Sequence, residues 1–464
     1  MLMIEIDPDK KKPLYEQIYE EIKRQIQVGT LPEKTKLPSA RALAKRLEIS
    51  RNTVDLAYGQ LTAEGYIESR PRSGYYVCMV EDLAALDIQV ETEEIDPEPK
   101  KEEMPYDFSP SGTEMEQFPY QVWRKLLKEV MINDNSELFQ KGDAQGDLGL
   151  RKAIMYYLRQ SRGVKVHCDQ IILGAGMENL LFLLRQTFGT KQIVGVENPV
   201  YTNAYGILKE LGFGVRPISM DQNGMKIDNL RKSDADLAYV TPAHQYPTGI
   251  VMPAGRRGQL LRWAKEKEGR YIIEDDYDSE FRYYGKPIPA LQGTDHHEKV
   301  IYIGTFSRVI APAIRVSYMV LPPKLLVKYR ENVTAFSCSV SRIDQAVLTL
   351  FLSEGHFERH LNRMRNIYKE KHDLLLHCIR QFMNGADISG QGAGVHVMID
   401  FHIRQNEQFE RELRKQGVVI YPLSFYYMEG KPKEEKYILG FTRMKKKDMI
   451  EGTRIIGNVL STIK

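Results

Sequence analysis

The chain has 464 residues, too many for one ordinary domain, and its hydrophobic content of 42% suffices for a large buried core. A net charge of +3 excludes a global polycation, so any nucleic-acid binding must come from a local basic patch. The four cysteines form no C-x-x-C pair, and there is no signal-peptide pattern or long apolar stretch, so we expect a cytoplasmic protein without disulfides, bound metal or a membrane partner.

Residues 1–80 have the pattern of a small helical domain. Apolar residues recur every four positions over 14–26, which predicts an amphipathic helix. A second helix opens at Ser39, and after a short turn Ser50 is a good N-cap for a third. Two short strand-like runs separated by Arg-Pro-Arg-Ser-Gly follow the third helix, and they predict a hairpin.

The turn between the second and third helices suits binding in the major groove of DNA. In such a motif the N-terminal end of the recognition helix faces the base edges, and its free amides and short polar side chains reach phosphates. Spacing alone leaves one alternative open, a helix bundle that binds another protein through a solvated basic face.

The run LPSARALAKRLEISRNTVDLAYGQLTAEGYIESRPRSGYYV resembles the winged helix-turn-helix of the GntR family of bacterial regulators. The resemblance covers nearly all of residues 13–77 and departs at Ala40, where an acidic residue is common. It implies that operator DNA is contacted by the second helix, the start of the third and the hairpin tip. The residues so assigned are Arg41, Arg51, Thr53, Arg72, Ser73 and Gly74, and the place of Asn52 at the start of the third helix adds it to the predicted contacts.

Residues 81–105 differ in composition from both flanking segments. They include ten acidic residues, two lysines and three prolines, and their few apolar residues show no sustained period. Such a segment cannot bury enough surface to order itself, so we expect an acidic linker. A solvated acidic helix over 82–88 is the alternative for part of it.

Residues 106–464 alternate strand-like and helix-like runs, which predicts an α/β domain with a mostly parallel sheet wrapped by helices. Polar or glycine-containing motifs follow several of the predicted strands, and the carboxyl ends of parallel strands are where such sheets bind ligands. The motifs are GAGME at 174–178, ENPVY at 197–201, TPAHQYPTG at 241–249, EDDYDSEF at 274–281 and GTFSR at 304–308.

In this order the motifs resemble those of fold-type I aminotransferases, and more closely those of the MocR subfamily of GntR regulators, which fuse a winged helix to an aminotransferase-like domain. The resemblance covers about 13–77 and 106–460. It implies a site for pyridoxal 5'-phosphate in which Asp275 meets the pyridine nitrogen, Tyr277 the ring hydroxyl and Tyr201 the ring face. The residues implied around the phosphate are Gly176, Met177, Glu178, Thr305, Ser307 and Arg315.

Two positions depart from the aminotransferase pattern. The Schiff-base lysine belongs in G-T-F-S-K, and this chain has Arg308 there. Because a guanidinium stays protonated and is a poor nucleophile, we expect no catalytic residue at this position and only non-covalent binding of the cofactor. The carboxylate-binding arginine of aminotransferases aligns with Ile438, and Arg443 lies nearby in the sequence.

These patterns predict a transcription regulator that binds operator DNA as a homodimer. Its large domain is expected to sense pyridoxal phosphate or an adduct of it with an amino compound. Two alternatives remain: an active transaminase with an appended DNA-binding domain, and a regulator whose large domain is only a dimerisation scaffold.

Overall fold

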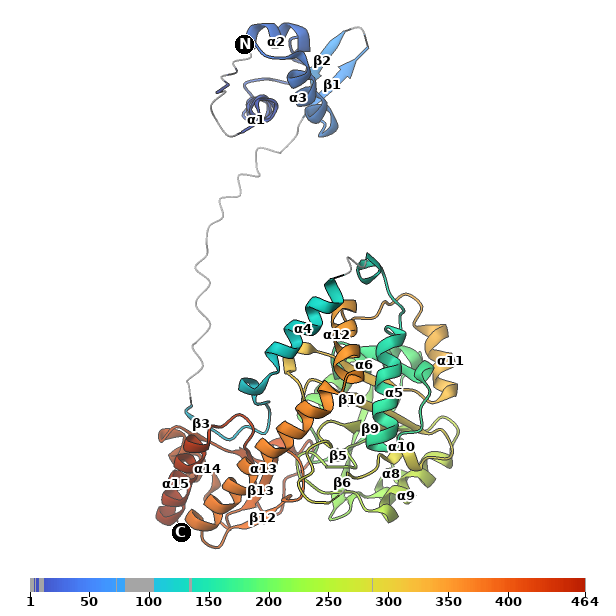
Figure 1. The fold of residues 1–464 in the computed structure, drawn as a ribbon, viewed down its shortest axis with the longest axis vertical. Coiled ribbons are helices and arrows are strands. Elements are labelled where there is room, and N and C mark those ends of the chain that lie inside the picture. Colours follow the sequence, from blue (N-terminus) through green and yellow to red (C-terminus); the bar gives the residue numbers. More distant parts are fainter. Residues whose placement is uncertain are drawn as a thin grey trace. The chain divides into compact units, whose positions relative to one another are not determined.

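The computed structural model describes residues 4, 6–7, 12–71, 73–79, 104–132, 136–285 and 287–463 (Figure 1). The chain divides into two compact units, 1–102 and 103–464, and each is described by itself. The predicted linker lies outside the described residues except at 104–105, and so does Arg72 at the hairpin tip.

The small unit has three helices and a two-stranded hairpin around one apolar core. Its elements are α1 (Leu14–Gln27), α2 (Ala40–Leu47), α3 (Arg51–Ala63), β1 (Ile67–Arg70) and β2 (Gly74–Val77). The hydroxyls of Ser39 and Ser50 each accept a main-chain N–H at 3.2 Å, so both predicted N-caps are present. The hairpin is antiparallel and pairs Ile67 with Val77. The unit is therefore a helix-turn-helix followed by a hairpin, as the sequence predicts.

The large unit is built on an eight-stranded sheet with the order β4-β11-β10-β9-β8-β5-β6-β7. The five central strands, from β10 to β6, pair in parallel, whereas β11 and β7 pair antiparallel to their neighbours. The strands are β4 (Ile171–Gly174), β5 (Ile193–Asn198), β6 (Gly214–Asp221), β7 (Gly224–Met225), β8 (Leu237–Val240), β9 (Tyr271–Asp276), β10 (Val300–Thr305) and β11 (Ser317–Val320).

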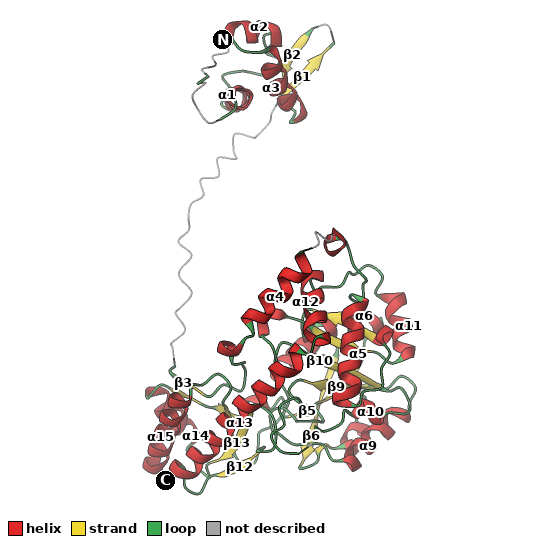
Figure 2. Cartoon of the chain, viewed as in Figure 1, coloured by secondary structure: helices red, strands yellow, loops and turns green. Residues whose placement is uncertain are grey.

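Helices pack on both faces of this sheet (Figure 2). Along β4, Ile172 packs with α6 on one face, whereas Ile171 and Leu173 pack with α5 on the other. Burial on both faces explains the apolar runs of β5, β8, β9 and β10. The helices around this sheet are α5 (Leu148–Arg162), α6 (Met177–Phe188), α7 (Thr202–Glu210), α8 (Ile227–Lys232), α9 (Ala254–Lys265), α10 (Leu291–Thr294) and α11 (Pro323–Asn332).

A second, four-stranded sheet near the C-terminus was not predicted from the sequence. Its order is β12-β13-β16-β15, and β3 pairs in parallel with β14 beside it, which joins the first residues of the unit to its last third. The remaining strands are β3 (Tyr106–Asp107), β12 (Asp387–Ser389), β13 (His396–Asp400), β14 (Val418–Val419), β15 (Tyr421–Pro422) and β16 (Tyr437–Gly440). The remaining helices are α4 (Tyr120–Met131), α12 (Arg342–Ser353), α13 (His356–Phe382), α14 (Asn406–Lys415) and α15 (Lys446–Ile463). Within the described ranges, no helix combines the length and apolarity needed to cross a membrane.

Candidate functional site

A cavity of about 500 Å³ lies at the carboxyl-terminal edge of the central sheet. Its walls include residues that follow β5 and β8, between which the strand order reverses, and open α/β sheets bind ligands at such a point. The cavity brings together all ten residues that the sequence predicts at a cofactor site: Gly176, Met177, Glu178, Tyr201, Asp275, Tyr277, Thr305, Ser307, Arg308 and Arg315.

One wall of the cavity combines a helix N-terminus with small and hydroxyl-bearing residues. Gly176 is the N-cap of α6 with φ +92°, a backbone conformation that favours glycine, and a Cβ there would lie 2.3 Å from a nitrogen of Arg315. The buried hydroxyl of Ser307 has no hydrogen-bond partner among the described residues. Free amides, a guanidinium and an unsatisfied hydroxyl form a donor set that fits a phosphate group. Glu178 forms an ion pair with Arg315, so a phosphate would share that guanidinium with a carboxylate.

Asp275, at the end of β9, is the buried carboxyl group of the cavity. The hydroxyl of Tyr239 on β8 donates a hydrogen bond to it. Burial raises the pKa of Asp275 to about 7, because the ionised carboxylate is poorly solvated there. A protonated ring nitrogen beside Asp275 would favour the ionised form, so this residue also fits a pyridine ring. Sequence reasoning missed Tyr239, since a tyrosine inside a buried strand gives no functional signal.

The acidic run in EDDYDSEF is divided between the two faces of the sheet. Asp276 points away from the cavity, where Arg162 of α5 lies 2.7 Å from it and the hydroxyl of Tyr302 donates to it at 2.6 Å. Glu274 accepts two main-chain N–H groups at α10, at 2.7 and 2.9 Å. The alternation of side chains along a strand therefore leaves Asp275 as the residue of these three that faces the cavity.

Aromatic side chains from three loops form another wall. The ring of Tyr246 contacts Tyr201 and Tyr277 edge-on, with centroids 5.2 and 5.7 Å apart. The Tyr277 hydroxyl lies 3.0 Å from Nδ1 of His244, which is also 2.9 Å from an oxygen of Asp278. His244 and Tyr246 both belong to the HQYPTG run, which the sequence marks as a motif without indicating what each residue does.

Arg308 lines the cavity just after β10. Its guanidinium donates to the main-chain oxygens of Pro110 at 2.8 Å and Gly112 at 3.5 Å. Its Nε is buried without a hydrogen-bond partner, and within the described part of the chain no carboxylate is at ion-pair distance. Residues 111–113 thus form a wall of the cavity that the sequence did not predict, because they lie far from Arg308 along the chain.

The two C-terminal positions singled out in the sequence differ in their surroundings. Ile438 is fully buried in β16 and does not line the cavity. The exposed Arg443 packs its aliphatic stem against Gly112, where a Cβ would lie 2.1 Å from Cδ of the arginine. Arg443 therefore contacts Gly112 but is not among the residues that line the cavity.

The residues predicted to contact DNA on α2 and α3 lie on the surface of the small unit. Arg41 and Asn52 are exposed. Arg51 is also exposed and lies 3.2 Å from Asp55, one turn along α3. The hydroxyl of Thr53, in contrast, is engaged locally, at 2.8 Å from the hydroxyl of Ser50.

Two basic groups that the predicted DNA-contacting set did not include lie on the hairpin or beside it. Ser73 Oγ lies 2.7 Å from the hydroxyl of Tyr76, and Gly74 has φ +109°, which favours glycine at the turn. The guanidinium of Arg70 lies 4.5 Å from the centre of the Tyr76 ring, and the amine of Lys36 lies 5.8 Å from it. Both cations are held beside the predicted wing.

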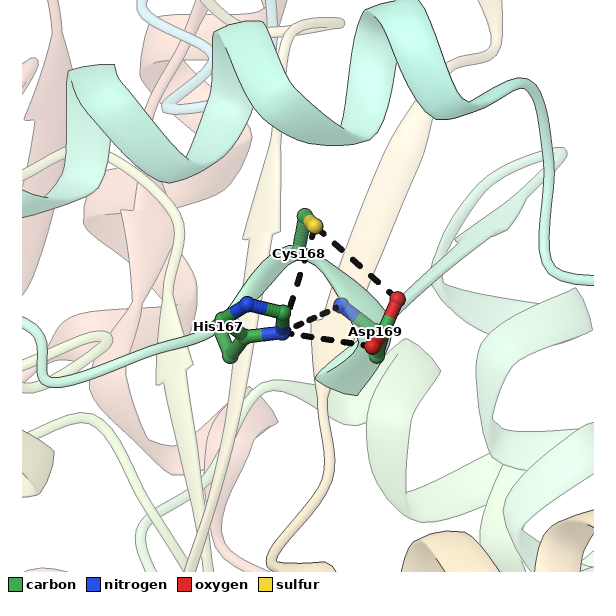
Figure 3. A group of neighbouring side chains, drawn as sticks. All are labelled: His167, Cys168 and Asp169. Carbon is green, nitrogen blue, oxygen red and sulfur yellow. Dashed lines mark hydrogen bonds and ion pairs between the residues drawn. The ribbon is translucent and has the colours of Figure 1, made fainter.

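His167, Cys168 and Asp169 place three possible metal ligands within 4.8 Å of one another before β4 (Figure 3). The main-chain N–H of Asp169 donates to Nδ1 of His167 at 3.5 Å, and that of His167 donates to the Gln170 side chain at 2.9 Å. The guanidinium of Arg151 lies 3.8 Å from Asp169, and its positive charge opposes a cation there. We therefore assign the cluster to the capping of a short 3-10 turn.

Comparison with known proteins gives matches over both units. The family model for bacterial regulatory proteins of the gntR family matches residues 14–77, and that for aminotransferase class I and II matches residues 111–435. The HTH-type transcriptional regulator YdeL of Bacillus subtilis is 38% identical over 444 residues, which cover 95% of this chain and 96% of YdeL. The probable rhizopine catabolism regulatory protein MocR of Rhizobium meliloti is 33% identical over 466 residues, which cover 97% of this chain and 94% of MocR.

A comparison of structures shows the fold of the large unit. The kynurenine aminotransferase of Pyrococcus horikoshii, solved in complex with PMP, has a TM-score of 0.68 and 24% sequence identity. The match covers 77% of this chain and 90% of that enzyme. The fold class and the resemblance expected from the sequence are both confirmed. The chain belongs to the MocR-type regulators of the GntR family, in which an N-terminal helix-turn-helix is joined to a domain with the fold of class I and II aminotransferases.

Proposed function

We propose that the protein is a homodimeric transcription regulator that binds operator DNA and whose large unit binds pyridoxal phosphate, or its adduct with an amino compound, without a covalent bond. The observation that carries this proposal is the cavity at the sheet edge, which is lined by the ten residues expected at a cofactor site, among them Arg308. The bound PMP of the structurally similar aminotransferase supports the class of ligand.

The residues of the cavity supply separate functions. The start of α6, Ser307 and Arg315 would hold the phosphate, and Asp275 would hold the proton on the ring nitrogen. The cofactor itself supplies an aldehyde that reacts with amines. Since Arg308 cannot shed its proton to attack that aldehyde, the site favours reversible sensing of a ligand over transamination.

The proposal is tested in two measurements on the full chain. Spectral titration with pyridoxal phosphate should show saturable binding that dialysis reverses, and added amino acid should produce no pyridoxamine phosphate. Operator fragments selected from a random DNA library should then change their affinity for the protein when the ligand is present. Absence of cofactor binding would favour the scaffold alternative, and turnover would favour the transaminase.

A further inference from the structure

The two guanidinium groups that line the cavity differ in their partners. Arg315 forms an ion pair with Glu178, so its charge is compensated within the protein. Arg308 donates only to two neutral main-chain oxygens, and its buried Nε has no partner in the described ranges. A cation partly removed from water with only neutral partners gains much from an anion, because charge-assisted hydrogen bonds are about twice as strong as neutral ones.

The two arginines also face different parts of the cavity. Arg315 lies against Gly176 at the start of α6, where the donor set fits a phosphate. Arg308 faces the segment 110–113, which is a separate wall. Asp275, which also lines the cavity, is hydrogen-bonded to Tyr239, and no ion pair joins it to Arg308 in the described ranges. The cavity thus has a second place for an anion.

We propose that Arg308 binds the carboxylate of an amino-acid group, so that the preferred ligand is an adduct of pyridoxal phosphate with an amino acid and not the free cofactor. This inference rests on the proposed function, since it takes the cofactor-like part of the ligand as given. A planar guanidinium with several donors matches a carboxylate, whereas a ligand with an ammonium group at this place is repelled. Ile438, buried in β16, offers no charge that could do the same.

The test uses two stable probes that differ in one carboxylate, N-(5'-phosphopyridoxyl)-alanine and N-(5'-phosphopyridoxyl)-ethylamine. Calorimetric titration of the full chain should show that the alanine probe binds about 10- to 100-fold more tightly, the range expected for a hydrogen-bonded charge pair. Arg308→Gln should reduce this ratio to about one while the ethylamine probe keeps its affinity within about threefold. Arg308→Lys retains a positive charge and should keep part of the ratio. This result would show that the loss in Arg308→Gln comes from the missing charge and not from misfolding.

Arg443→Gln is the matched control, because Arg443 also lies next to Gly112 but does not line the cavity. This variant should leave the ratio unchanged. Equal binding of the two probes by the wild type would overturn the inference and leave the proposed function intact. Failure of both probes to bind would overturn both the inference and the proposed function. Loss of the ratio in Arg443→Gln alone would mean that Arg443, and not Arg308, binds the carboxylate.

Discussion

The buried environment of Asp275 lowers the stability of the folded protein when the carboxyl group is ionised. The carboxyl group is buried, and its pKa of about 7 means that the fold destabilises the ionised form. The unfolded chain releases this proton near the ordinary pKa of 3.8, whereas the folded protein keeps it up to about pH 7. Across that window the folded state binds more protons than the unfolded state, so Asp275 lowers stability progressively as the pH rises.

Asp275→Asn should therefore stabilise the protein in the absence of ligand, and more so at higher pH. The gain of the variant over the wild type should grow by roughly 2–3 kcal/mol between pH 5 and pH 8, since one pKa unit corresponds to about 1.4 kcal/mol. Chemical unfolding at a series of pH values measures it. The same variant should bind pyridoxal phosphate weakly. Stability curves of variant and wild type that run parallel from pH 5 to pH 8 would contradict this assignment.

Arg308→Lys should change the chemistry of the cavity without changing its frame. A lysine here, unlike the arginine, can transiently release its proton and form a Schiff base with the aldehyde of pyridoxal phosphate, with loss of water. We expect a new visible absorbance band, and borohydride treatment should then fix a pyridoxyl group on residue 308. The wild type and Arg308→Gln are the controls and should show neither. A lysine variant without the band would mean that the cavity differs from an aminotransferase site by more than this residue.

The motifs at the strand ends, together with the resemblance to aminotransferases, predicted ten of the residues that line the cavity. Gly176 and Ser307 follow β4 and β10, and Asp275 lies at the end of β9, so the fold itself brings them to one edge of the sheet. Contacts between residues distant in sequence were not predictable in this way. The hydrogen bond from Arg308 to Pro110 joins residues that are 198 positions apart in the sequence, and no local pattern signals it.

Among the elements, α3 begins at an N-cap that the sequence predicts, Ser50, and its first residue is the exposed Arg51. The Ser50 cap fixes the first turn of α3, and the Arg51 side chain remains 68% exposed beyond it. An exposed guanidinium at this end of a recognition helix is free to contact a base edge or a phosphate, since the surface pair with Asp55 is weak.

Arg51→Ala should weaken operator binding by about 1–3 kcal/mol, or roughly 10- to 100-fold, without unfolding the small unit. Fluorescence anisotropy with a selected operator fragment measures the affinity, and circular dichroism checks the fold. Arg24→Ala is a suitable control, because Arg24 lies on α1, is 62% exposed and pairs with Glu21 in a similar way. If both variants bind the operator fragment as tightly as the wild type does, the predicted contact between Arg51 and DNA is wrong.

Elements with strong periodicity were predictable, and short ones were not. Six strands of the large sheet contain apolar runs that the sequence marks clearly: β4, β5, β8, β9, β10 and β11. The second sheet depends on β12, with three residues, and β15, with two, which are too short to show a period. Their strand structure comes from pairing with β13 and β16, which is a property of the tertiary fold.

At the scale of the whole molecule, α4 and the segment after it point to a partner surface. Leu126 is the only buried residue of this twelve-residue helix. Large apolar side chains are exposed on the helix and shortly after it, among them Tyr120, Leu127, Met131, Ile132 and Phe139. A cluster of this kind is typical of an interface, and a second copy of the chain would cover it in the homodimer that we propose.

Sedimentation velocity at micromolar concentration should show a dimer for the wild type. The double substitution Ile132→Glu with Phe139→Glu should shift it to monomer, because each glutamate would have to lose its hydration in an apolar interface. Val327→Glu on α11 is the control, since Val327 is 56% exposed but lies outside the α4 cluster, and it should remain dimeric. A wild type that sediments as a monomer would contradict the proposal.

The bond between Arg308 and Pro110 couples the cavity to the first described part of the large unit. Arg308 donates to the main-chain oxygens of Pro110 and Gly112, and β3, a few residues earlier in the chain, is paired with β14. A ligand that takes up the donors of Arg308 would free the backbone at 110 and 112 while β3 stays paired. In the regulator that we propose, occupancy of the cavity would thus be registered first by the backbone at 110–113, on the large unit's side of β3.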